Sequence, residues 1–81
     1  MGSIYETWKR QKNEYEDYLG FVKFGDFYIT FNQDAEVVAE TLHINIGTTN
    51  CKRCSAIPVE SWNDSSEFLK KEGFIIVHTE A

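Results

Sequence analysis

The first apolar stripe of the chain has the spacing of a helix. Its large residues recur every three or four positions between polar ones, and they are Ile4, Tyr5, Trp8, Lys12 (through its stem) and Tyr15. A stripe of this width is typical of a helix that packs on one face, so we expect a helix over residues 4–15.

The next apolar run has the character of β-strands. Residues 20–31 are dense in Phe, Val, Tyr and Ile, and only Gly25 and Asp26 interrupt them. Aromatic and β-branched residues on both sides of a Gly-Asp pair indicate a β-hairpin, with strands near 20–24 and 26–31.

The middle of the chain returns to helical spacing and then to alternation. Turn-forming and helix-starting residues at 32–34 precede a short helical stripe of Ala35, Val38, Ala39 and Leu42. The alternation over 43–47 predicts a strand, and the polar residues 48–53 predict a loop.

The last third contains a strand, a helix and a strand. Residues 54–59 predict a short strand that Pro58 confines to its end. Capping residues at 61–64 start a helix in which we expect Phe68 and Leu69 to pack inward and Gly73 to mark the end. Residues 74–77 predict the final strand.

The predicted order of elements is αββαββαβ. Strands that alternate with helices favour the α/β (α+β) class, with a mixed β-sheet flanked by helices. The sequence contains neither a repeat nor a linker, and 81 residues suffice for one small core. We therefore expect a single domain over residues 1–81.

Composition and charge exclude some classes of protein for this chain. The chain is 42% hydrophobic and 15% aromatic, which is typical of a folded domain, and no apolar run approaches the roughly 18 residues of a membrane span. Two cysteines are too few for a secreted disulfide framework, so we expect a soluble, cytoplasmic protein. A net charge of −5 argues against strong autonomous DNA binding without excluding a weak contact.

One segment resembles a known family. Residues 24–35 read F-G-D-F-Y-I-T-F-N-Q-D-A, which resembles the R-M-G-D-F-Y-E-L-F-x-x-D-A pattern of the N-terminal mismatch-recognition domain (domain I) of the DNA mismatch repair protein MutS. The likeness continues along nearly the whole chain: residues 5–18 look like the opening helix, 55–58 stand where the family has A-G-I-P, and 74–80 resemble the closing strand. The family implies the same mixed sheet with flanking helices.

The resemblance also implies a mechanism. In MutS dimers this domain approaches the minor groove, the Phe of an F-x-E motif stacks on a mispaired base, and the Glu hydrogen-bonds to that base. Such a ring acts as a wedge, because a weakened base step costs less to open than a well-stacked one.

Carried over by position, the candidate DNA-binding residues are Phe27, Lys23, Ile29 and Tyr28. Phe27 matches the stacking Phe, and Lys23 falls at the Arg before the turn. Ile29 stands where the Glu belongs and offers no acceptor to a base edge, so the polar half of mismatch reading is absent. At the motif, the chain resembles family subunits that lack this Glu and do not themselves read the mismatch.

Two positions for Phe27 remain open at this point. Ideal alternation places it on the same strand face as Ile29 and Phe31, which would put it in the core. The resemblance places it at an exposed hairpin end, and a bend beside Gly25 would allow this. Tyr28 and Phe31 also suit packing.

Other reactive residues have weaker patterns. Cys51 and Cys54 form a lone C-x-x-C in a loop, without the helix N-terminus that redox chemistry requires. With His43 and His78 they would make four zinc ligands, yet the spacing resembles no zinc finger. We expect no metal and no cofactor.

Enzymatic activity is not expected. The sequence has no G-x-x-x-x-G-K-[ST] pattern, and no second acid lies at a catalytic spacing from Asp26, which suits a turn. We expect a DNA-binding module with affinity no better than about 10⁻⁴ to 10⁻⁶ M at physiological salt. The alternative is a protein-interaction module that docks on a DNA repair or replication partner without binding DNA. Whether the chain stands alone or is part of a longer protein stays open.

Overall fold

The computed structural model describes residues 4–49 and 52–80. Within these ranges the elements are α1 (Ile4–Glu14), β1 (Leu19–Phe24), β2 (Phe27–Phe31), α2 (Asn32–Leu42), β3 (Gly47–Thr49), β4 (Lys52–Pro58), the short 3-10 helix η1 (Val59–Ser61), α3 (Trp62–Lys71) and β5 (Ile76–Glu80). The predicted order αββαββαβ is confirmed, with η1 as an addition.

The strands form one mixed sheet in the order β3-β4-β2-β1-β5. β1 pairs antiparallel with β2 and parallel with β5, while β4 pairs antiparallel with β2 and with β3. This topology, with helices on both faces, confirms the predicted fold class.

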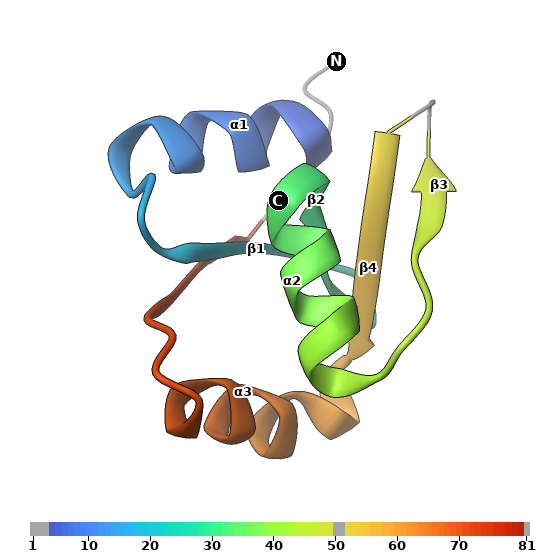
Figure 1. The fold of residues 1–81 in the computed structure, drawn as a ribbon. Coiled ribbons are helices and arrows are strands. Elements are labelled where there is room, and N and C mark those ends of the chain that lie inside the picture. Colours follow the sequence, from blue (N-terminus) through green and yellow to red (C-terminus); the bar gives the residue numbers. More distant parts are fainter. Residues whose placement is uncertain (1–3, 50–51, 81) are drawn as a thin grey trace.

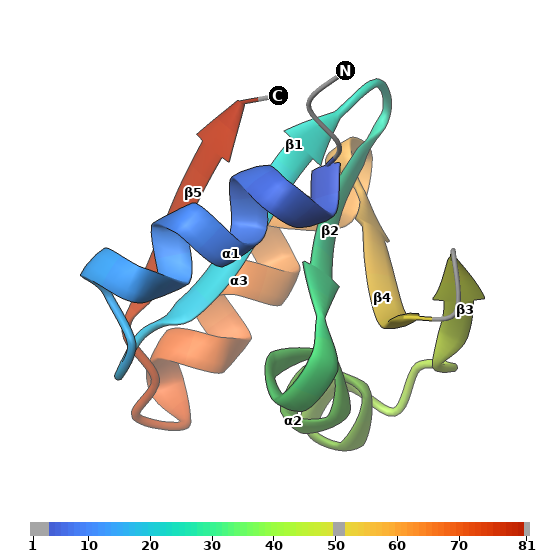
Figure 2. The ribbon, with the colours of Figure 1, turned by 90° about the horizontal axis from the view of Figure 1, so that it is seen from above.

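The sheet lies between α1 on one face and α2 with α3 on the other (Figures 1 and 2). The cluster between the sheet and α2 and α3 is built from Leu19, Phe21, Tyr28, Val38, Ile57 and Leu69. The cluster under α1 is built from Trp8, Val22 and Phe31. Because strand residues point alternately to the two faces, β1 is buried on both sides from Leu19 to Val22.

Asp34 joins three elements in the interior. Its two carboxylate oxygens each lie 2.9 Å from the Lys12 ammonium, and one also accepts the Gly20 backbone N–H at 3.0 Å. Lys12 in turn donates to the Tyr18 carbonyl. The side chain therefore ties α1 and the start of β1 to α2. The expected capping by residues 32–34 is not seen, since Phe31 is the N-cap and no side chain bonds there.

The predicted strand over 43–47 is wrong. His43 adopts φ +57° and donates its backbone N–H to Ala39, and Ile44 donates to the same carbonyl, so the chain is still closing α2. Ile44 then packs against the core from this loop. Gly47 begins the strand, and the predicted loop 48–53 contains parts of β3 and β4.

Two expectations about the last third also need correction. β5 begins at Ile76 and reaches Glu80, because Phe74 donates to the Leu69 carbonyl and Gly73 takes φ +99° to close α3. Leu69 is fully buried as predicted, whereas Phe68 faces outward and is 43% exposed. Trp62 supplies the inward-facing ring instead.

Candidate nucleic-acid interface

The β1–β2 hairpin ends in a two-residue turn that sets two phenylalanines side by side. Phe24 and Phe27 are direct partners across the strands, and Gly25 and Asp26 connect them. Gly25 has φ +61° while Asp26 does not have a positive φ, which is the pattern of a type II′ turn. Glycine suits the first position because a side chain there is strained.

Both rings are exposed. Phe24 is 55% and Phe27 44% accessible, so of the two positions that the sequence left open for Phe27 the structure has the exposed one. The suggested bend is absent, because the hairpin register runs unbroken from Val22–Ile29 to Phe24–Phe27. Phe27 keeps the strand face of Ile29 and Phe31; those two pack in the cluster under α1, and Phe27 lies beyond it.

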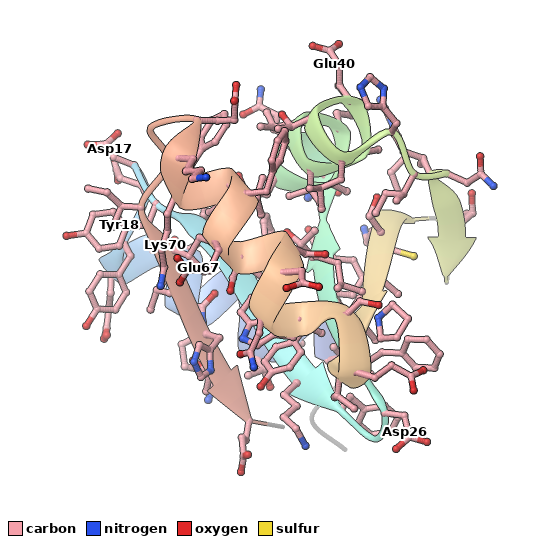
Figure 3. All side chains as sticks on the ribbon, turned by 90° about the horizontal axis from the view of Figure 1, so that it is seen from below. Asp17, Tyr18, Asp26, Glu40, Glu67 and Lys70 are labelled. Carbon is pink, nitrogen blue, oxygen red and sulfur yellow. The ribbon has the colours of Figure 1, made fainter. Side chains whose placement is uncertain are left out.

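The turn is fixed to the neighbouring segment. The Val59 backbone N–H donates to the Asp26 carbonyl at 2.9 Å, and Pro58 is the partner of Phe27 in β4. Val59 is itself exposed. We define the hairpin tip as residues 24–27 together with Pro58 and Val59. In Figure 3 the Asp26 side chain marks this end and points away from the body of the protein.

Lys23 and Tyr28 face the other side of the hairpin. They are direct partners, and Tyr28 is buried with its ring stacked on Trp62 at 3.9 Å and 9° between planes. The His78 ring meets both aromatic rings edge-on. Packing roles for Tyr28 and Phe31 are thereby confirmed. Lys23 is half-buried, with Glu80 as its partner in β5.

The four candidate residues therefore do not gather on one surface. Phe27 and Ile29 share the α1 side of the sheet, and Lys23 and Tyr28 share the α3 side. Ile29 is half-buried against the cluster of Trp8 and Phe31. Of the four, only Phe27 is exposed, with 44% of the residue accessible.

The structure adds residues that sequence reasoning did not select. Phe24 lies opposite Phe27 across a two-residue turn, so hairpin pairing was a signal that could have found it. The Lys52 ammonium lies 4.8 Å from the centre of the Tyr5 ring. That contact joins β4 to α1, and nothing in the sequence indicated it.

Charge is distributed unevenly over the two faces of the sheet. α1 carries two acidic and three basic residues, whereas α2 carries three acidic residues and no basic one. Arg53 is paired with Glu36 of α2. Near the tip, Asp26 and Glu60 are acidic. Two of the three acidic residues of α2 are ion-paired, Asp34 with Lys12 and Glu36 with Arg53, so the excess of acidic residues on α2 is largely neutralised.

Of the four possible zinc ligands, the three that the structure describes, His43, Cys54 and His78, do not form a group. His43 ends α2, His78 packs on Tyr28 and Trp62, and Cys51 lies outside the described residues. Among residues 4–49 and 52–80, no three His, Cys, Asp or Glu side chains form a group that could hold a metal ion. Within the same ranges, every helix is too short or too polar to cross a bilayer.

Comparison with known proteins agrees with the resemblance of residues 24–35. A sequence model of the family described as MutS domain I matches residues 3–80. The DNA mismatch repair protein MutS of Petrotoga mobilis is 35% identical over 63 residues, which is 78% of this chain and 8% of that protein. The MutS protein of Oleidesulfovibrio alaskensis is 38% identical over 56 residues, or 69% of this chain and 6% of its own length.

A third relative extends the match along the chain. The MutS protein of Thermotoga petrophila is 28% identical over 71 residues, which is 88% of this chain and 9% of the relative. The chain thus spans less than a tenth of the length of these relatives. Since the family match covers nearly every residue and the fold agrees with it, this chain belongs to the MutS domain I family.

Proposed function

We propose that this chain is a DNA-binding module of the mismatch-recognition type, in which the Phe27 ring enters a weakly stacked base step. The observation that carries the proposal is the exposure of an aromatic ring at a hairpin tip that is hydrogen-bonded to η1. The relatives are named DNA mismatch repair proteins, which supports the same class of ligand. An apolar side chain that partly unstacks a base step is a known means of recognising deformable DNA.

In this proposal, the preference for mismatched DNA depends only on how easily a base step is deformed. Ile29 has no hydrogen-bonding atom in its side chain and is held half-buried beside Phe31. The wedge therefore discriminates by the cost of opening the base step, which is lower where bases are mispaired. Binding is expected in the non-specific range of about 10⁻⁴ to 10⁻⁶ M at physiological salt.

Lys23 adds a cation to the proposed site, on the face of the hairpin opposite to the two phenylalanine rings. It lies in β1 directly before Phe24, on the side of the hairpin opposite to the rings. A ring inserted in the minor groove has a phosphate strand on each side, so a cation at this position suits one of the two strands.

The test compares two equally exposed phenylalanines. Fluorescence anisotropy is measured on a matched and on a mismatched duplex at several salt concentrations, for the parent chain, Phe27→Ala and Phe68→Ala. Phe68 in α3 is 43% exposed, close to the 44% of Phe27. We expect Phe27→Ala to lose the preference for the mismatched duplex and Phe68→Ala to keep it. Equal affinity of the parent chain for both duplexes would reject the proposal.

A second candidate function is docking on a protein of the DNA repair or replication machinery. The observation that favours it lies at the opposite end of β1, where Tyr15 and Tyr18 stack at 5.4 Å beside the exposed Ile75. Glu14, Glu16 and Asp17 are sequence neighbours of the two tyrosines and are exposed, which fits a basic partner (Figure 3 shows Asp17 and Tyr18). A pulldown that loses its protein partner on Ile75→Glu, without any shift of DNA, would select this function.

A further inference from the structure

We propose that Lys52 and Lys9 form a phosphate-binding pair on the α1 side of the sheet, so that the DNA backbone lies along β4 from the hairpin tip to Lys52. This inference rests on the proposed DNA-binding function and goes further by assigning the face, the direction and the cations of the contact.

One face of β4 is continuous with the exposed rings. In register, Pro58 is the partner of Phe27, Ala56 of Ile29 and Cys54 of Phe31. Partners across strands point to the same side of a sheet, so these β4 residues share the α1 side. The cluster under α1 covers β1 and β2 and reaches β4 only at Cys54, and Ala56 is exposed.

Lys52 stands at the far end of this face with its charge held in place. Its ammonium lies over the Tyr5 ring at 4.8 Å, where the negative face of the ring attracts it. Tyr5 is fixed in turn, since its ring meets Phe31 edge-on at 5.3 Å and its hydroxyl accepts from the Asn32 amide. A positioned cation loses less side-chain freedom when it meets a phosphate.

Lys9 places a second cation on the flank of α1 that carries Tyr5. It follows Tyr5 by four positions in α1, and residues four apart lie on the same flank of a helix. The Lys52 ammonium contacts the Tyr5 ring. Lys9 lies one helical turn after Tyr5 in α1 and is exposed. Glu6 is the nearest acidic residue of the helix in sequence.

The distance between the hairpin tip and Lys52 is one that a DNA duplex can span. Lys52 lies six residues from Pro58 along β4, or about 20 Å at the usual rise of a strand. Successive phosphates of one DNA strand lie about 3.4 Å apart along the axis, so a single duplex reaches both the rings and Lys52.

Salt-dependent binding to a matched duplex tests the inference, with charge-neutralising variants of equal size. Lys52→Gln and Lys9→Gln are compared with Lys70→Gln and Lys71→Gln, two lysines in the last turn of α3. Each of the first two should lower the slope of log affinity against log salt by about one, and reduce binding about threefold to tenfold at low salt on matched and mismatched duplexes alike. Lys52→Arg should restore the slope, and the α3 variants should leave it unchanged.

The possible failures separate the two proposals. If the parent chain prefers mismatched DNA but Lys52→Gln and Lys9→Gln bind as it does, the phosphate pair is rejected and the proposed function stands. An equal loss in the α3 variants would also reject the pair, because the effect would then reflect net charge alone. If the parent chain does not bind DNA, both proposals fall. Circular dichroism of each variant shows whether a loss of binding comes from unfolding.

Discussion

The two halves of the segment 24–35 differ sharply in their surroundings, although both resemble the family pattern. At its start, Phe24 and Phe27 are exposed, with 55% and 44% of each residue accessible. At its end, Phe31, Asp34 and Ala35 are buried, and Asp34 bonds to Lys12 and to Gly20. The first half presents side chains outward, and the second half holds the fold together.

Because of this difference, a match to the sequence motif does not support the fold and the DNA contact equally. A chain that kept only the second half would still place a hairpin against α2, because the buried residues determine the packing. Sequence similarity in the buried second half supports the fold, whereas the proposed contact with DNA depends on the exposed first half. Here the exposed half keeps the Phe and loses the Glu, so the fold is more completely retained than the proposed recognition chemistry.

The largest effect is expected from removing the buried carboxylate. Asp34→Ala removes the buried carboxylate that bonds to the Lys12 ammonium and to the Gly20 backbone N–H, which should lower the free energy of unfolding by about 3 kcal/mol. Urea denaturation followed by circular dichroism measures it. Asp26→Ala, in the exposed turn, should change the same quantity by less than about 0.5 kcal/mol. Similar losses in both variants would contradict the division of the segment into two halves.

The next comparison uses one residue type in both halves. Phe31→Ala should cost about 3 kcal/mol, because it opens a cavity between Trp8 and Val22. Phe27→Ala should cost less than about 1 kcal/mol, since the ring is already partly in water. The midpoint of urea unfolding gives both values, and a cost at Phe27 equal to that at Phe31 would mean that the Phe27 ring is buried in solution.

A smaller effect is expected at the turn itself. Gly25→Ala places a methyl group on a residue with φ +61°, at an expected cost of about 1 kcal/mol. No neighbouring atom lies within 4 Å of the added carbon, so the cost is conformational alone. Thermal unfolding should show a modest fall in midpoint. An unchanged midpoint would show that the turn relaxes freely.

The smallest effect should come from restoring an acceptor. Ile29→Glu places a carboxylate where the family pattern has one, and a hydrogen bond to a mispaired base should raise the preference for mismatched DNA by about threefold. Ala56→Glu is the matched control, because Ala56 is the exposed partner of Ile29 and receives the same charge. An equal change in both variants would assign the effect to charge and not to the position.

Much of the fold could be predicted from the sequence, because its elements carry clear local patterns. The helical stripe around Trp8, the aromatic hairpin and the stop at Gly73 each depend on neighbours close in the chain. The strand over 43–47 was wrong because alternation of Ile44 and Ile46 arises equally when a loop packs one side chain inward. Phe68 was misassigned because Trp62 and Leu69 already fill the inner face of α3.

The candidate site was only partly predictable. Phe27 could be selected from the motif, but its exposure depends on where α1 stops covering the sheet, which is a tertiary property. The division of Lys23 and Phe27 between two faces followed from strand alternation and could have been anticipated. The contact of Lys52 with Tyr5 joins residues 47 positions apart, which is beyond the reach of local patterns.

The bond from Val59 to Asp26 has a kinetic consequence for the proposed wedge. Because the hairpin end is hydrogen-bonded to η1, we expect it to lose little flexibility when its ring enters a groove. We expect that loss of this hydrogen bond would leave the rate of association with a ligand nearly unchanged and would raise the rate of dissociation.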